Sequence, residues 1–152
     1  MTDIPRMTEI IHDAARSTIY AANCTFDEAH ARHMLTQAIA QRGKREDGGT
    51  FCVVHEVDGR VEGMLILVLC RVYLVAHQLR AMDLLWYCAK GAAPGAGLRM
   101  LKAGLAWCGK VPGLVEVDIV PTDIAGDPRR VGRLLQRLGF NECGRMYRKE
   151  MA

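Results

Sequence analysis

The spacing of hydrophobic positions divides the chain into predicted helices and strands. Apolar side chains recur every three or four residues over 5–20, which predicts an amphipathic helix. A second helix is predicted from Thr25 to about Arg42, because Thr25 and Glu28 have the spacing of a capping box. The polar stretch 43–49, which contains several glycines and charges, ends that helix.

The middle of the chain changes to the residue types of strands. Residues 50–57 and 61–75 are rich in β-branched and other apolar side chains. Asp58-Gly59 separates them and predicts a tight hairpin, because a type I′ turn needs positive φ. A third strand is predicted over 81–89, and strands joined by short turns pair antiparallel.

The last third of the chain alternates helices and strands. A glycine-rich loop over 91–97 leads into a helix that ends near Trp107, and a strand follows over 114–120. The next helix spans 127–138, with Pro128 in its first turn and Gly139 just after its end, before a final strand over 142–151. This order predicts one α/β domain over 1–152, with a mixed, largely antiparallel twisted sheet and about four helices.

Composition excludes several classes of protein. With 50% hydrophobic and 24% charged residues, the chain is expected to fold rather than remain disordered. The net charge of +3 is too small to indicate a nucleic-acid partner by itself. None of the six cysteines forms a C-x-x-C pair, and several stand in apolar runs, so we expect buried, reduced thiols. The longest apolar run is far too short to cross a bilayer and the N-terminal residues lack a secretion-signal pattern, which predicts a cytoplasmic protein without a membrane partner.

The glycine-rich loop carries the strongest functional signal. A helix start leaves backbone N–H groups without partners, and small residues before it let an anion approach them closely. A Walker loop is excluded because Leu98-Arg99 replaces Gly-Lys-Ser/Thr, and a dinucleotide fingerprint lacks its third glycine at Met100. A plain strand-to-helix turn remains the alternative. The amides that we expect to bind phosphate are those of Ala93, Gly95, Ala96, Gly97 and Leu98.

Three features resemble the GNAT acetyltransferases. Gly95-Ala96-Gly97 fits the second half of that family's acyl-CoA loop, (Gln/Arg)-x-x-Gly-x-(Gly/Ala). The tail 137–151 resembles the family's ending, in which Leu-Gly-Phe precedes Gly and Tyr-x-Lys. The predicted order of helices and strands is similar over nearly the whole length. Within the family, residues 83–88 together with Trp107 look most like acetyltransferases carried by phages and prophages.

The resemblance implies a GNAT-like fold and direct transfer of an acetyl group from acetyl-CoA to a primary amine. Backbone groups near Tyr87, Cys88 and Ala89 would pair with pantetheine, and the loop from Ala92 onward would hold the rest of the CoA. Homodimers are frequent in the family, so a homodimer is an expectation here.

Three positions depart from the family's pattern. Ala92 stands where the loop usually has Gln or Arg, and Pro128 where the last helix usually has Asn. Leu135 replaces the Tyr that commonly protonates the departing thiolate, so Tyr147 becomes the candidate acid, with Cys143 or an ordered water as alternatives. A catalytically silent CoA-binding or interaction module therefore remains the alternative function.

Asp83 is the candidate general base, because it is a carboxylate within an otherwise apolar strand. The alternative is a structural ion pair with Arg80 or Arg71. Strict alternation predicts two faces for this strand, one with Asp83, Leu85 and Tyr87 and the other with Met82, Leu84, Trp86 and Cys88.

Other polar residues give weaker signals. Arg129, Arg133 and Arg137 form one helical stripe, which suits CoA phosphates, an anionic acceptor, a nucleic acid or merely a solvated face. Tyr73 and His77 stand near a strand break and are candidates for substrate contact or simple surface residues. The two histidines of His30-x-x-His33 lack further ligands at metal spacing, so no metal is predicted.

Overall fold

The computed structural model describes residues 3–18, 20–73, 76–122 and 126–144. Five helices and four strands occur in this part of the chain. In chain order they are α1 (Ile4–Arg16), α2 (Tyr20–Asn23), α3 (Glu28–Ala40), β1 (Thr50–Val57), β2 (Arg60–Arg71), β3 (Leu79–Cys88), α4 (Ala96–Cys108), β4 (Leu114–Asp118) and α5 (Pro128–Arg137). The predicted final strand lies mostly outside the described residues, since 145–152 are not among them.

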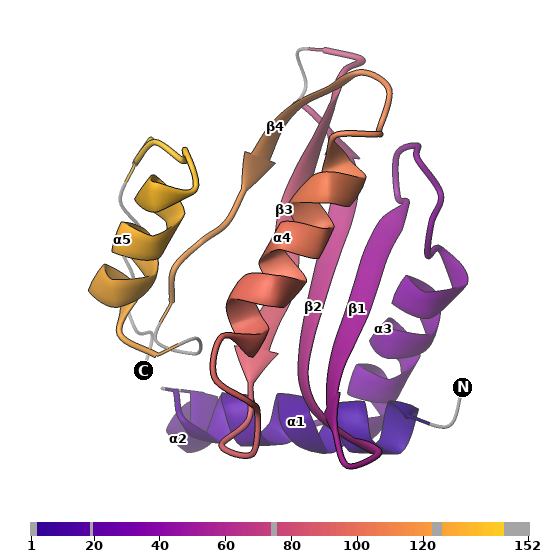
Figure 1. The fold of residues 1–152 in the computed structure, drawn as a ribbon. Coiled ribbons are helices and arrows are strands. Elements are labelled where there is room, and N and C mark those ends of the chain that lie inside the picture. Colours follow the sequence, from indigo (N-terminus) through magenta and orange to yellow (C-terminus); the bar gives the residue numbers. More distant parts are fainter. Residues whose placement is uncertain (1–2, 19, 74–75, 123–125, 145–152) are drawn as a thin grey trace.

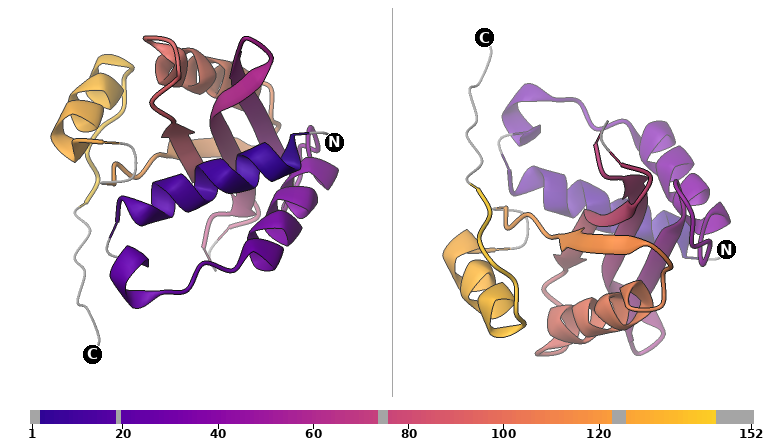
Figure 2. Two further views of the ribbon diagram at one scale, coloured as in Figure 1. Left: turned by 90° about the horizontal axis from the view of Figure 1, so that it is seen from below. Right: turned by 90° about the horizontal axis from the view of Figure 1, so that it is seen from above.

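The four strands form one sheet in the order β1-β2-β3-β4, with α4 on one face and α1 and α3 on the other (Figures 1 and 2). The first three strands pair antiparallel, and β4 runs parallel to β3. Asp58 and Gly59 have φ values of 51° and 76°, as the predicted hairpin requires. The predicted mixed, largely antiparallel α/β fold is therefore confirmed.

The core lies on both faces of β2. Leu65, Leu67 and Leu69 pack toward α4, whereas Met64 and Ile66 pack toward α1 and α3. Successive strand residues point to opposite faces, so a strand covered on both sides needs a continuous apolar run. This burial explains why residues 61–69 show no polar alternation.

Two predicted helix boundaries are wrong. The first helix ends at Arg16, and the short α2 follows it separately. The second begins at Glu28 with Asp27 as its N-cap, whose side chain accepts a hydrogen bond from the His30 N–H at 2.9 Å. Asp27 rather than Thr25 caps this helix because Asp27 is the residue directly before its first turn.

The predicted faces of β3 are also wrong, because the strand contains a β-bulge. Asp83 pairs with Leu67 and Leu85 pairs with the adjacent Ile66, which leaves Leu84 as an extra residue. Residues that pair directly lie on the same face of the sheet. Asp83 consequently lies on the α4 face with Leu67, whereas Leu85 joins Ile66 on the opposite face.

Candidate functional site

The end of β3 separates from β4 and has no strand partner on that side among the described residues. The two strands pair from Leu79 and Leu114 to Met82 and Asp118, and within the described residues the ladder does not continue further. β3 itself runs on to Cys88, where the glycine-rich loop leads into α4. As far as the described part of the chain goes, the backbone donors and acceptors at this edge have no partner strand and suit an extended ligand.

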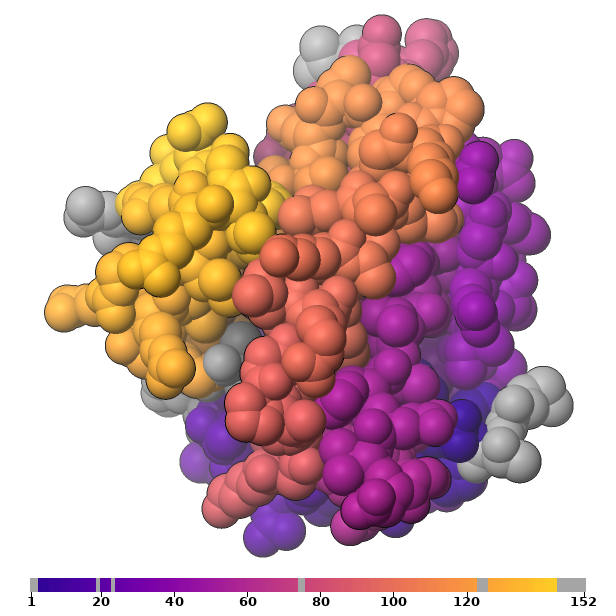
Figure 3. All heavy atoms as spheres, in the orientation of Figure 1, coloured from indigo at the N-terminus to yellow at the C-terminus, as the bar shows by residue number. Residues whose placement is uncertain are grey.

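A cavity of about 890 Å³ lies at this point, between the end of β3, the start of α4 and helix α5. Figure 3 shows α5 (yellow) beside α4 on this side of the molecule. The cavity is lined by three groups of residues and by Ser17 of the segment after α1. They are Trp86, Tyr87 and Cys88 of β3; Gly95, Gly97 and Leu98 at the start of α4; and Gly126, Asp127, Arg130, Val131, Arg133, Leu134 and Arg137 in and before α5.

The loop adopts a conformation that depends on glycine at position 95. Gly95 caps α4 with φ 75°, in the left-handed region that other residues rarely adopt. The Ala93 N–H donates to His55 Nε2 at 3.3 Å, and the Ala96 N–H donates to the Ala93 carbonyl at 3.0 Å. Two of the five amides predicted to bind phosphate, those of Ala93 and Ala96, therefore already have nitrogen or oxygen acceptors within the protein.

The residues that carry the other three amides, Gly95, Gly97 and Leu98, line the cavity. The Gly97 N–H contacts the Cys88 thiol, whose pKa is raised chiefly by burial and lowered in part by this N–H and by Arg99. A Cβ at Gly97 would lie 3.3 Å from the indole Nε1 of Trp86, so a small residue is needed there. Among the described residues, the amides of Gly97 and Leu98 donate to no backbone carbonyl, as expected for the first turn of a helix.

Helix α5 presents three arginines to the cavity: Arg130, Arg133 and Arg137. The predicted stripe contained Arg129 instead of Arg130, and Arg129 does not line the cavity. Asp127 caps this helix by accepting the Arg129 N–H at 3.0 Å, with Pro128 at the first position. Three guanidinium groups make this wall strongly attractive to an anion.

Asp83 lies at the point where β3 and β4 separate. Its Oδ1 accepts a hydrogen bond from the Val120 N–H at 3.0 Å. Burial raises the pKa of this carboxyl to about 6. The hydrogen bond from the Val120 N–H lowers the pKa in part, and the nearby Asp118 raises it further. The alternative interpretation, an ion pair of Asp83 with Arg80 or Arg71, is not found among the described residues, since Arg80 pairs with Asp118 at 3.4 Å and Arg71 with Asp47 at 3.5 Å.

The structure brings together only part of the predicted site. Tyr87, Cys88, Gly95, Gly97 and Leu98 line one cavity. Five predicted residues belong to the same strand–loop–helix segment but do not line the cavity, namely the candidate base Asp83 and the alanines Ala89, Ala92, Ala93 and Ala96. Tyr147 lies outside the described residues, so its predicted role as the acid remains a prediction. Leu135, at the family's usual tyrosine position, is buried in the core.

Sequence reasoning missed several residues of this region. Trp86 lines the cavity from the α4 face of β3, where it pairs with Leu65 of β2. His55 contacts the loop from β1, and its signal was a polar residue in an apolar strand.

Within the described residues no cluster of His, Cys, Asp or Glu has the arrangement of a metal site. None of the helices in this part of the chain has both the length and the apolar character that crossing a bilayer requires.

No protein-family model matches the chain, and no curated protein sequence matches it. Its fold nevertheless matches solved structures over nearly the full length. A possible acetyltransferase from Clostridium difficile 630 is 12% identical with a TM-score of 0.69, covering 99% of this chain and 93% of that chain. A ribosomal-protein-alanine N-acetyltransferase from Brucella melitensis biovar Abortus 2308 is 12% identical with a TM-score of 0.66, and the match covers 99% of this chain and 94% of that chain.

An aminoglycoside acetyltransferase from an uncultured soil metagenomic sample, solved in complex with sisomicin, is 14% identical with a TM-score of 0.61, covering 99% of this chain and 91% of that chain. Identities this low show a shared fold and nothing finer. The chain thus has the mixed α/β fold of the GNAT acetyltransferases.

Proposed function

We propose that this protein is an N-acetyltransferase that transfers an acetyl group directly from acetyl-CoA to a primary amine. The observation that carries the proposal is the cavity of about 890 Å³, where the end of β3, the start of α4 and the arginines of α5 meet. The fold match to acetyltransferases supports it, and two of those structures belong to enzymes named for amine-containing acceptors.

The lining of the cavity fits the chemistry of a CoA thioester. CoA phosphates need cations and backbone N–H donors, which Arg130, Arg133, Arg137 and the first amides of α4 supply. The pantetheine arm is an extended chain with amide groups, which suits the open edge of β3 near Tyr87. Trp86, Val131 and Leu134 add apolar surface for its methylene groups.

In the proposed reaction Asp83 takes a proton from the acceptor amine, directly or through a water molecule. Bound acetyl-CoA would supply an activated acyl group. The amine nitrogen forms a bond to the acetyl carbon as the carbon–sulfur bond breaks, and the sulfur leaves with a proton, so that the products are an amide and a thiol. A carboxyl with a pKa of about 6 is ionised at neutral pH and remains a better base than an ordinary aspartate. Tyr147 remains the candidate donor of the proton to sulfur.

The position of the α5 arginines favours a small anionic ligand over a nucleic acid. Arg130, Arg133 and Arg137 share a cavity with the start of α4, where guanidinium groups and backbone N–H donors can bind the phosphates of one small ligand together. Membership of a phage-borne subgroup, a homodimer and a cytoplasmic location remain predictions from the sequence.

Calorimetric titration with acetyl-CoA and release of free thiol with a panel of primary amines test the proposal. We expect binding to one site and turnover with at least one amine. Arg133→Ala should weaken acetyl-CoA binding about tenfold by removing one charged contact of about 1.4 kcal/mol. Arg129→Ala is the matched control, because Arg129 is on the same helix but outside the cavity lining.

Two results would contradict the proposal in different ways. Absence of binding at millimolar acetyl-CoA would remove the CoA site altogether. Tight binding without turnover over a broad panel of amines would favour a catalytically silent CoA-binding module.

A further inference from the structure

A buried carboxylate lies beneath the start of the glycine-rich loop. Glu62, in β2, is only 7% exposed. It is the extra residue of a β-bulge, since His55 pairs with Gly63 and Glu56 pairs with Val61. A bulge redirects a side chain and is frequent beside functional sites. Burying a charged carboxylate is costly unless it has partners, so its surroundings need an explanation.

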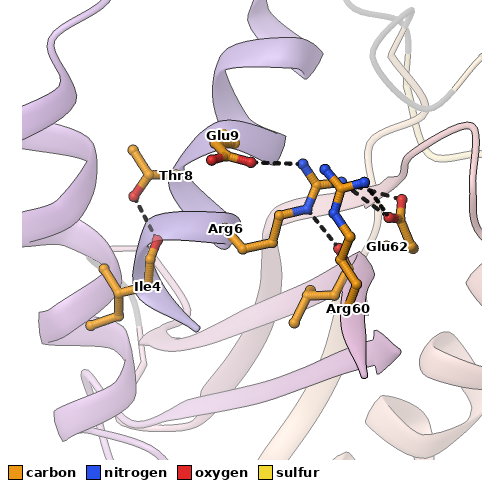
Figure 4. A network of polar contacts seen from close by, with 7 residues as sticks. Ile4, Arg6, Thr8, Glu9, Arg60 and Glu62 are labelled. Atoms are coloured by element: carbon orange, nitrogen blue, oxygen red, sulfur yellow. Dashed lines mark hydrogen bonds and ion pairs between the residues drawn. The ribbon is translucent and has the colours of Figure 1, made fainter. Parts of the chain in front are cut away.

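Arg6 of α1 is the main partner of this carboxylate (Figure 4). Arg6 Nη2 donates to Glu62 Oε2 at 3.2 Å, and Arg6 Nε donates to the carbonyl oxygen of Val61 at 2.9 Å. The same guanidinium also contacts Glu9 on α1 at 2.9 Å, and the more exposed Arg60 is 3.5 Å from Glu62 Oε1. Arg6 thereby fixes the orientation of the Glu62 side chain.

The other side of Glu62 contacts the loop. The Ala89 N–H donates to the backbone carbonyl of Glu62 at 2.8 Å. A Cβ on Gly91 would lie 2.8 Å from Glu62 Oε2 and 2.9 Å from its Cδ, so the loop backbone rests directly against the carboxylate. Both the main chain and the side chain of Glu62 therefore determine where the loop begins.

His55, on the partner strand of the same hairpin, contacts the loop further along. Its Nε2 accepts the Ala93 N–H at 3.3 Å. The β1–β2 hairpin thus contacts alternate loop residues, 89, 91 and 93, immediately before Gly95 starts α4. The direction of the first α4 amides depends on this support, because the loop connects them to the sheet.

We propose that Glu62 is a positioning residue that holds the loop 89–95 in the conformation that binds the acyl-CoA phosphates, with Arg6 fixing its carboxylate. This inference rests on the proposed function. Glu62 does not line the cavity and so acts through the loop rather than on the ligand. Its removal is expected to affect CoA affinity and leave the rate at saturation unchanged.

The test compares Glu62→Gln with the control Glu9→Gln. Both variants remove one carboxylate that contacts Arg6, but Glu9 is on α1, and its contact with Arg6 does not involve the loop. For Glu62→Gln we expect amide hydrogen exchange over 89–97 in the free protein to accelerate at least tenfold. The Kd and KM for acetyl-CoA should rise at least tenfold with kcat within twofold of wild type. Glu9→Gln should leave all of these within twofold.

A second pair of variants tests the contact itself and does not depend on Glu62→Gln folding. Gly91→Ala should weaken acetyl-CoA binding at least tenfold, because the three atoms nearest to the new Cβ all belong to Glu62. In the Glu62→Ala background, where those atoms are gone, the same Gly91→Ala change should weaken binding less than twofold.

The inference is overturned if Glu62→Gln changes neither loop exchange nor Kd beyond twofold, or if Gly91→Ala weakens binding equally in both backgrounds. Failure of wild-type protein to bind acetyl-CoA would instead reject the proposed function. In that case the exchange comparison alone decides whether Glu62 positions the loop.

Discussion

Replacing Asp83 by asparagine should stabilise the protein at neutral pH, although most substitutions of half-buried residues destabilise. Burial raises the pKa of Asp83 from its ordinary value of 3.8 to about 6. The folded protein therefore binds more protons than the unfolded chain between these pH values. The free energy of unfolding falls as the pH rises through this range, so ionised Asp83 lowers stability above pH 6.

The magnitude follows from the two pKa values. A change from 3.8 to about 6 corresponds to about 3 kcal/mol at pH 8, since one pKa unit is about 1.36 kcal/mol. Residual solvent contact reduces this figure, and we expect a gain of about 1–3 kcal/mol for Asp83→Asn. The asparagine Oδ1 still accepts the Val120 N–H and carries no charge to desolvate. At pH 4, where folded Asp83 is protonated, the two proteins should differ by a few tenths of a kcal/mol.

Urea unfolding followed by tryptophan fluorescence from pH 4 to pH 8 measures this difference. Asp58→Asn is the matched control, because Asp58 is an exposed turn residue that undergoes the same chemical change. A stability difference for Asp83→Asn that does not vary with pH, or a loss of stability at pH 8, would refute the reasoning. If Asp83 is also the base, the stabilised variant should lose kcat/KM. That combination would separate a catalytic carboxylate from a structural one.

Three further predictions concern the cavity and the helices. Raising the salt concentration from 50 to 200 mM should weaken acetyl-CoA binding in calorimetric titrations, and the loss of affinity should be larger for the wild type than for Arg133→Ala. The reason is that salt screens the charge of Arg133, which the variant lacks. Asp127→Ala should lower the free energy of unfolding by about 1 kcal/mol in urea titrations, because it removes the N-cap of α5. Asp127→Asn should leave the free energy of unfolding unchanged, because asparagine can cap the helix in the same way. Gly104→Ala should destabilise the protein by about 1–3 kcal/mol, because the new Cβ would lie 3.0 Å from Leu67 Cδ1. Gly132→Ala should instead stabilise α5 by up to about 1 kcal/mol in the same assay, because there is open space around Gly132.

Local signals allowed much of the fold to be predicted from the sequence. Asp58-Gly59 marked the hairpin because few other residues adopt positive φ at both turn positions. Gly95 marked the start of α4, and Pro128 and Gly139 marked the ends of α5, where Gly139 has φ 89°. Each of these features depends on the conformation of one or two residues, which is why short sequence patterns were sufficient.

The composition of the cavity was less predictable, because it depends on which faces of distant elements meet. Arg129 and Arg130 are adjacent and equally charged, and only the orientation of α5 determines that Arg130 lines the cavity. His55 and Glu62 each stand out as polar residues in apolar strands, but their contact with the loop follows from the hairpin packing beneath it. Sequence alone could mark these residues as unusual without saying what they contact.

The bulge at Leu84 had the largest consequence, and no local sequence signal indicated it. Without the extra residue, strict alternation would put Asp83 on the face of Leu85 and Tyr87, away from α4. The observed register instead puts Asp83 on the same face as Trp86, which lines the cavity. A single inserted residue therefore brings the proposed base to the α4 face of the sheet, where Asp83 pairs with Leu67 beside the middle of that helix and outside the cavity lining. Burial at that position also raises its pKa, so the stability cost and the proposed catalytic role of Asp83 have the same structural origin.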